Sequence, residues 1–404
     1  MSPVKKIALI DNMNNNFFAL ARYLRDLGHD ADLYLIPNNS MVHFHPQRDT
    51  WSDISQVEWI KRFPFDYGSL SYLPFRNKLR NAFNSYDIIV ACGNAVGLLQ
   101  QARIKIDFFV PYGSDLYHTP FIDRYEKRSS GLLGWVQHFF DRRRSRLQSA
   151  GIQQSRVIIC NNNWELAKIS LDRLGSIAHN LPRVMVYLED TAPPDLELNV
   201  SDDNDFVVFS PTRHMWCTNA DKLPDFDVNG GTKRNDKLIR AFARLVEMGV
   251  YKAPQLWMCD YGQDVDASKL LIETLGISKN VIWFPLMDRR ELLEYAKQAT
   301  FIADQFRQTM SATSAGTTNE ALAIGVPVIA NTDGAITDKN DPYCGAPILQ
   351  ALEEDEILEH LLLHSRDYEA YETIAREGRL FFEKNLGIGL TRKYLDLLTK
   401  KVCK

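Results

Sequence analysis

The chain has 404 residues, of which 45% are hydrophobic and 24% charged, so it is long enough for two or three globular domains. Lysine and arginine total 47 against 51 acidic residues, and the formal charge of -4 argues against a general nucleic-acid-binding protein. The six cysteines show neither zinc-ligand spacing nor a disulfide pattern, which favours a reducing, cytoplasmic location. We expect no signal peptide and no transmembrane helix, because every apolar run is too short.

The first residues predict a β-α-β unit of Rossmann type. Residues 7–10 and 31–36 are apolar runs typical of buried strands, and residues 17–27 have apolar side chains at helical spacing. The absence of a G-x-G-x-x-G motif argues against a dinucleotide at the first turn. A loop rich in asparagine precedes the helix, and at least one of these residues is expected to cap it.

Further strands are predicted at 86–90, 108–110 and 157–160, and the run at 184–188 closes the first half of the chain. Residues 42–83 are aromatic-rich and are interpreted as an irregular insertion that shapes one wall of a cleft, with core packing as the alternative. The strand at 108–110 leads into Pro-Tyr-Gly-Ser-Asp-Leu, which places Asp115 and His118 at the carboxyl edge of a parallel sheet. Doubly wound folds bind ligands at that edge, although a helix cap and a surface histidine are the simpler interpretations.

Residues 131–148 predict an amphipathic helix in which aromatic and aliphatic side chains give way to four arginines. A helix of this kind can lie on an anionic membrane surface, whereas the alternative is a core helix with a solvated basic end. The polar, acidic stretch at 192–205 is predicted to link two domains.

The second half repeats the alternation of strands and helices. A strand at 206–210 leads to Arg213, and a polar run ends at Lys233 just before an amphipathic helix. Residues 217–230 are interpreted as an inserted loop. Strands at 256–259 and 281–284 lead to Gly262 and Leu286, and a C-terminal helix is predicted at 380–401.

Residues 301–331 predict strand, loop, helix and strand. The first strand ends at Asp304-Gln305, small hydroxyl residues fill the loop at 311–318, and Glu320 is expected to open the helix. Free N–H groups at a helix N-terminus suit a phosphate, while the Glu320 carboxylate suits neutral hydroxyls such as a ribose diol. The alternative is an ordinary Rossmann strand-loop-helix unit, in which Gly325 only ends the helix and Pro327 only starts the next strand.

This segment resembles the donor site of family 4 glycosyltransferases, which have the GT-B fold. The matching residues are Asp304-Gln305, Gly316 and the run from Glu320 to Ile329, which reads EALAIGVPVI. The resemblance implies an α/β protein with two Rossmann-like domains facing across a cleft. Residues 1–200 would bind the acceptor, 206–378 would bind the nucleotide sugar, and 379–404 would form a helix crossing back to the first domain. The second glutamate of the family, eight residues earlier, is replaced here by Ala312.

The resemblance also implies roles for individual residues. Arg213 and Lys233 would clamp the donor diphosphate, and with Asp115 they are the predicted catalytic residues. Glu320 would bind the ribose, and the other predicted donor-binding residues are Asp304, Gln305, Gly262, Leu286, Ser314, Gly316, Thr317 and Thr318. The predicted acceptor-binding residues are Asn14, Asn15, Asn16, Gly113, Ser114 and His118.

The implied reaction transfers a sugar from a nucleotide-diphosphate sugar to a glycan or lipid-linked glycan, with retention. No cofactor is expected, and the absence of an Asp-x-Asp motif between strands predicts independence of a metal ion. Polysaccharide biosynthesis in the cytoplasm, with peripheral contact to the inner membrane face as an option, would fit this reaction. The alternatives are an inactive binding or scaffold subunit, a sugar-nucleotide epimerase, or a phosphorylase, for which no pyridoxal lysine is identified.

Overall fold

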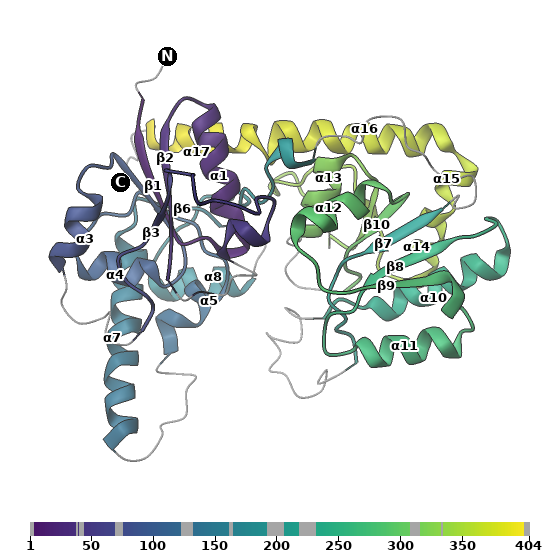
Figure 1. The fold of residues 1–404 in the computed structure, drawn as a ribbon, viewed down its shortest axis with the longest axis horizontal. Coiled ribbons are helices and arrows are strands. Elements are labelled where there is room, and N and C mark those ends of the chain that lie inside the picture. Colours follow the sequence, from purple (N-terminus) through teal and green to yellow (C-terminus); the bar gives the residue numbers. More distant parts are fainter. Residues whose placement is uncertain are drawn as a thin grey trace. The chain divides into compact units, whose positions relative to one another are not determined.

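The computed structural model describes residues 4–37, 39, 44–68, 76–122, 132–160, 165–191, 206–217, 232–307, 316–332 and 334–399. The chain divides into two compact units (Figure 1). The first comprises Met1–Tyr187 with Leu386–Lys404, and the second comprises Leu188–Asn385. The first boundary precedes the predicted linker at 192–205, which lies outside the described residues. The second falls in a break between two helices, where a single helix at 380–401 was expected.

The first unit is built on a parallel sheet. Within the described residues its strand order is β3-β2-β1-β4-β5-β6. The strands are β1 Lys6–Ile10, β2 Asp30–Leu35, β3 Ile60–Arg62, β4 Ile88–Ala91, β5 Phe108–Phe109 and β6 Val157–Ile158. Strand β1 is central, with Ile7 opposite both Ala31 and Ile88. The order reverses between β1 and β4, and doubly wound folds bind ligands beyond the carboxyl ends of the strands at that point.

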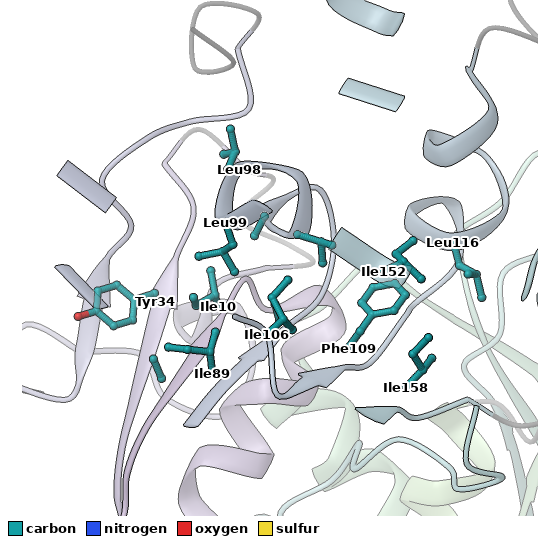
Figure 2. Close-up of a cluster of buried hydrophobic side chains, with 14 of the residues drawn as sticks. Ile10, Tyr34, Ile89, Leu98, Leu99, Ile106, Phe109, Leu116, Ile152 and Ile158 are labelled. Carbon is teal, nitrogen blue, oxygen red and sulfur yellow. The ribbon is translucent and has the colours of Figure 1, made fainter. Parts of the chain in front are cut away.

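Helices cover this sheet and close its core. They are α1 Asn16–Asp26, α3 Arg76–Phe83, α4 Ala95–Gln101, α5 Ser114–Tyr117, α7 Leu132–Gln154, α8 Glu165–Leu174 and α17 Ile388–Thr399, with 3-10 turns η1 Met13–Asn15, η2 Pro46–Arg48 and η4 Thr119–Phe121. Figure 2 shows Ile89 and Phe109 of the strands beside Leu99 of α4 and Ile152 of α7. Burying each such side chain stabilises the fold by about 1.5–3 kcal/mol.

The second unit has a parallel sheet of the same relative order. Within the described residues the order is β12-β11-β10-β7-β8-β9. The strands are β7 Val207–Ser210, β8 Gln255–Cys259, β9 Val281–Phe284, β10 Phe301–Ala303, β11 Val328–Ala330 and β12 Leu349–Gln350. The order reverses between β7 and β10, where Phe301 lies opposite Val208. The loops after these two strands therefore occupy the position expected for a ligand.

The helices of the second unit are α10 Asn235–Met248, α11 Val265–Thr274, α12 Arg289–Lys297, α13 Gly316–Ile324, α14 Glu354–Leu361, α15 Leu363–Arg366 and α16 Tyr368–Asn385, with 3-10 turns η5 Leu188–Thr191 and η6 Ser278–Asn280. Phe206, Phe242 and Phe301 are fully buried in its core. No helix among the described residues of the chain is long and apolar enough to cross a bilayer.

Two further predictions of local structure are wrong. Residues 184–188, which close the first half, alternate in burial but form no strand, and a bridge joins Ile159 to His179. Residues 42–83 are not wholly irregular, because they contain β3 and α3. Helix α13 begins at Gly316, so Glu320 lies one turn inside the helix and does not open it.

Candidate functional site

Lys233 joins three segments at the switch point of the second sheet. Its backbone N–H donates to the carbonyl of Met215 (2.7 Å), in the loop after β7. Its own carbonyl accepts from the N–H of Phe306 (3.0 Å), in the loop after β10. Its ammonium Nζ donates to Oε1 of the buried Gln305 (2.8 Å). Lys233 is thereby fixed just before α10 and between the two loops that flank the switch point.

The surroundings of Lys233 carry an excess of positive charge. Burial lowers the pKa of its ammonium to about 8. The carboxylate of Asp304 opposes that shift, whereas the cations of Arg307 and Arg213 add to it. Arg213 is exposed, at the end of the loop that leaves β7, and Arg307 is buried. Lys233 therefore has two cations and one carboxylate near it, and this excess of positive charge suits a ligand with negative charge.

Asp304 connects β10 to the start of α13. The hydroxyl of Thr318, in the first turn of α13, donates to its Oδ2 (2.6 Å). Its other oxygen, Oδ1, is buried and has no hydrogen-bond partner among the described residues. A buried carboxylate oxygen without a donor is unfavourable, so a hydroxyl or amide of a ligand at this place would stabilise the site.

Gly262 allows the loops after β7 and β8 to touch. It has φ 120°, and a Cβ atom there would lie 2.4 Å from both the nitrogen and the oxygen of the His214 backbone. The His214 N–H donates to the carbonyl of Tyr261 (2.7 Å), and the His214 carbonyl accepts from the N–H of Asp264 (3.1 Å). The predicted donor-site glycine therefore has a clear role in loop packing.

His214 was not anticipated from the sequence. It is fully buried, its Nδ1 lies 2.8 Å from the hydroxyl of Ser268, and its ring packs against Trp283 with centroids 5.0 Å apart. Burial lowers the pKa of the imidazole to about 4, so the ring is neutral near pH 7. Its position directly after Arg213 was the only available signal.

Glu320 is engaged with a neighbouring helix. Its Oε1 accepts from the Nε of Arg289 in α12 (2.8 Å), with the two side chains only 13% and 17% exposed. Among the described residues, it does not share hydrogen bonds with Lys233, Asp304 or Gln305. The structure therefore groups Lys233 with Asp304, Gln305 and Thr318, and places Glu320 in a separate ion pair on α13.

Of the remaining predicted donor residues, two adjoin Thr318 in sequence. Gly316 and Thr317 are half-buried at the start of α13. Leu286 follows β9 and is an exposed apolar side chain. Ser314 and Ala312 lie outside the described residues.

Asp115 organises the corresponding edge of the first unit. Its buried carboxylate accepts from the backbone N–H groups of Gly93 (2.9 Å), Gly113 (2.9 Å) and Tyr112 (3.1 Å). It thus binds the loops after β4 and β5 together. Burial raises the pKa of this carboxyl to about 6, a shift that those N–H groups and Arg183 restrain.

A second buried carboxyl, Asp11, lies beside the same glycine and was missed in the sequence. It has φ 74° and accepts from the hydroxyl of Tyr67 and the amide of Asn39. A Cβ atom on Gly93 would lie 2.1 Å from its Oδ2, so only glycine fits there. Burial raises the pKa of Asp11 to about 7, with Asp115 contributing in the same direction. Its position immediately after the first buried strand was the signal that could have identified it.

The asparagine loop before α1 is largely occupied by its own hydrogen bonds. Asn12 Oδ1 accepts from the N–H of Phe18 (2.9 Å), and its Nδ2 donates to Asn15 Oδ1 (2.6 Å). Asn15 and Asn16 are buried, and Asn14 is exposed with φ 51°. The N-cap residue of α1 is Asn15, which makes no side-chain capping bond, whereas Asn12 satisfies one N–H of the first turn from outside the helix. Asn14 is the asparagine of the loop that faces solvent. Farther along the chain, Ser114 is exposed and His118 is half-buried.

Solved structures with this architecture span nearly the whole chain. HepE from Anabaena, in complex with UDP and glucose, is 15% identical with a TM-score of 0.58, covering 98% of this chain and 99% of that one. The chain has the GT-B fold. A sucrose-phosphate synthase from Thermosynechococcus elongatus is 17% identical (TM-score 0.59), covering 98% of each chain. A putative UDP-N-acetylglucosamine 2-epimerase from Listeria monocytogenes is 12% identical (TM-score 0.56), covering 98% of this chain and 96% of that one.

A family model matches part of this GT-B chain. Residues 230–380 match the family described as "Glycosyl transferases group 1". Comparison with the curated proteins gives no match. The matched segment contains Lys233, Asp304, Thr318 and Glu320, so the candidate site of the second unit lies almost entirely within it.

Proposed function

We propose that the chain is a glycosyltransferase that moves a sugar from a nucleotide-diphosphate sugar to a glycan or a lipid-linked glycan. The observation that carries this proposal is the group formed by Lys233, Arg213 and Asp304 at the switch point of the second sheet. This group lies in the unit whose residues 230–380 match the group 1 glycosyltransferases. Neighbours of the same fold hold UDP and glucose, which makes UDP-glucose the first donor to test.

Each residue of the group has a role in the proposed reaction. Lys233 and Arg213 stabilise the charge that develops on the departing diphosphate, as positioned cations do in other transferases. The N–H groups at the start of α13 add to that stabilisation. Asp304 accepts a hydroxyl of the donor through Oδ1, and Glu320 accepts the ribose hydroxyls while it remains paired with Arg289.

We further propose that transfer retains the configuration of the sugar and needs no metal ion. Two cationic side chains and a helix N-terminus supply the positive charge that a divalent cation would otherwise bring to the diphosphate. In front-face transfer the leaving phosphate takes the acceptor proton, so no separate general base is required of this unit. The exposed Asn14 and Ser114 would contact the acceptor, and the buried Asp115 would position the loop that carries Ser114. Full activity in EDTA is the expected result, and dependence on added magnesium would contradict metal independence.

The test is a panel of nucleotide sugars, with release of nucleoside diphosphate and the shift in melting temperature as readouts. Lys233→Ala should lower turnover at least tenfold, because the loss of about 1.4 kcal/mol of transition-state stabilisation already has that effect. Lys252→Ala, at an exposed position of the same unit, should leave turnover unchanged. No release and no thermal shift with any donor would favour an inactive binding subunit, for which the replacement of a family glutamate by Ala312 is the motivating observation.

A sugar-nucleotide epimerase is the second candidate, because a putative epimerase shares the fold over 98% of this chain. Product analysis separates the two. An epimerase converts one nucleotide sugar into its epimer in the absence of an acceptor, whereas a transferase produces nucleoside diphosphate and a glycosylated acceptor in equal amounts.

A further inference from the structure

Helix α7 of the first unit exposes a group of large apolar side chains. Trp135 is 67% exposed, Phe139 is 53% exposed and Val136 is 39% exposed. The rings of Trp135 and Phe139 stack on each other, with centroids 6.3 Å apart and planes 22° apart. Adjacent aromatic side chains left in water are unfavourable and usually mark a contact surface in a soluble protein.

The exposed aromatic rings continue into positive charge along the same face of α7. Trp135, Phe139, Arg142 and Arg146 are spaced i, i+4, i+7 and i+11, so they form one stripe along the helix. Arg142 and Arg146 are both exposed. We call these four residues the α7 stripe. It is aromatic at its N-terminal end and basic at its C-terminal end.

The rest of the unit holds α7 by a different face. Asp141, Ser145 and Gln148 are buried at i, i+4 and i+7. The hydroxyl of Ser145 donates to the carbonyl of Pro120 (2.7 Å), and Gln148 donates to the carbonyls of Gly93 and Asp115 (3.0 Å each). Figure 1 shows one end of α7 extending past α4, α5 and α8. The α7 stripe is thus presented to solvent on a helix whose other face is anchored.

We propose that the α7 stripe docks the first unit on an anionic lipid surface. Tryptophan and phenylalanine rings insert at the boundary between headgroups and acyl chains, where an apolar ring is buried without a full crossing of the bilayer. Arg142 and Arg146, one and two turns farther along, pair with lipid phosphates. The one carboxylate buried on this part of α7, Asp141, accepts from the amide of Gln137 (3.0 Å) and lies on the anchored face. This inference is independent of the proposed transferase activity.

The test is sedimentation of the full-length protein with vesicles. Vesicles of phosphatidylglycerol and phosphatidylcholine should bind it, and vesicles of phosphatidylcholine alone should bind it at least tenfold more weakly. W135S/F139S and R142Q/R146Q should each lower the partition coefficient about tenfold or more, since each basic residue near an anionic surface contributes roughly fivefold. Raising the salt concentration should weaken binding of the wild type.

Matched control variants distinguish an effect specific to the α7 stripe from a general loss of exposed apolar side chains or of positive charge. I177S/L270S removes two other exposed apolar side chains, which are 91% and 64% exposed, and R290Q/R376Q removes two other exposed arginines. Both controls should bind like the wild type, and all variants should keep the wild-type melting temperature. Absence of vesicle binding by the wild type, or an equal loss in the controls, would overturn the proposal. The proposal would also be overturned if the wild type formed a concentration-dependent dimer in the absence of lipid and W135S/F139S abolished it. The α7 stripe would then join two copies of the chain.

Discussion

At the scale of single residues, Lys233 has the most informative environment. Its ammonium is half-buried between the loops after β7 and β10, and burial brings its pKa from 10.5 to about 8. The Lys233 ammonium is thus still mostly protonated at neutral pH, but its pKa lies only slightly above that pH. A bound diphosphate would raise this pKa again, since two negative charges beside the ammonium favour its protonated form.

This coupling predicts how nucleotide affinity depends on pH. Between pH 7 and 9 the Kd of the wild type for UDP should rise above about pH 8, approaching tenfold per pH unit, because binding then requires uptake of a proton by Lys233. The terminal phosphate is already ionised in this range, so its own titration does not contribute. Titration calorimetry of the wild type and of Lys233→Met would measure the effect. The variant should bind more weakly with a flat profile, and an equal pH dependence in both proteins would show that Lys233 does not contact the diphosphate.

The same residue has a consequence for stability. Its folded pKa lies below its unfolded value, so the unfolded chain binds more protons between about pH 8 and 10.5. The contribution of Lys233 to stability therefore becomes less unfavourable as the pH rises through that interval.

The position of a residue relative to the strands was predictable where that residue follows the end of an apolar run. Arg213 follows β7 and Asp304 follows β10, so their neighbourhood could be inferred from the order of apolar runs. Asp11 and His214 occupy equivalent strand ends but were missed, because a single polar residue beside a strand does not reveal that it will be buried. Their burial depends on Gly93 and Gly262, whose missing side chains let separate loops approach.

At the scale of secondary-structure elements, α7 joins several backbone segments of the first unit through one side chain. Its Gln148 is completely buried and joins three backbone groups, since it also accepts from the N–H of Gly97 (3.0 Å). One side chain thereby forms hydrogen bonds with backbone groups in the loop after β4, at the start of α4 and in the first turn of α5.

Replacement of Gln148 should therefore destabilise the first unit. Gln148→Leu leaves the carbonyls of Gly93 and Asp115 and the N–H of Gly97 without their partner, at a cost of about 3 kcal/mol in the free energy of unfolding. Urea denaturation followed by circular dichroism would measure it. Gln154→Leu, on the same helix but exposed, is the matched control and should change the free energy by less than about 0.5 kcal/mol. Similar values for the two variants would mean that water replaces these hydrogen bonds.

Element prediction failed where pairing, and not local sequence, decides the structure. Strand β3 reads Ile-Lys-Arg, which has no apolar alternation, and it forms because its backbone pairs with the edge of β2 at Leu33. Residues 184–188 have the alternation but no strand pairs with them among the described residues. The strands in the interior of both sheets were predictable, because continuous apolar runs are typical of parallel strands that are covered on both faces.

At the scale of the whole molecule, two sheets of the same order account for the GT-B architecture. The alternation of strands and helices predicted Rossmann-like units, whereas the GT-B fold was inferred from the resemblance of residues 301–331 to a known family. The C-terminal helix belongs to the first unit, as the resemblance implied, although it follows the second unit in sequence. Its start was less predictable, because α17 begins at Ile388 and not near residue 379. Its Tyr394 stacks on Phe108 of β5 with ring centroids 6.1 Å apart, and the hydroxyl donates to the carbonyl of Pro182.

Tyr394 should consequently stabilise the first unit across a large separation in sequence. Tyr394→Ala removes a buried aromatic side chain and its hydrogen bond, and should cost about 3–5 kcal/mol in the free energy of unfolding. Hydrogen exchange would locate the loss, with amides of residues 6–10 and 108–109 exchanging faster than those of 207–210. Lys393→Ala, exposed on the same helix, should leave the exchange pattern as in the wild type. Faster exchange spread evenly over both sheets would show instead that the units unfold together.

The division of the chain also bears on the order in which the protein is made. The second unit is one uninterrupted segment, Leu188–Asn385, whereas the first has pieces from both ends of the chain. A ribosome therefore releases every residue of the second unit before it supplies the last helix of the first. The earlier part of the first unit therefore leaves the hydrophobic surface that Leu390 and Tyr394 later bury open to chaperones until residues 386–404 have been made.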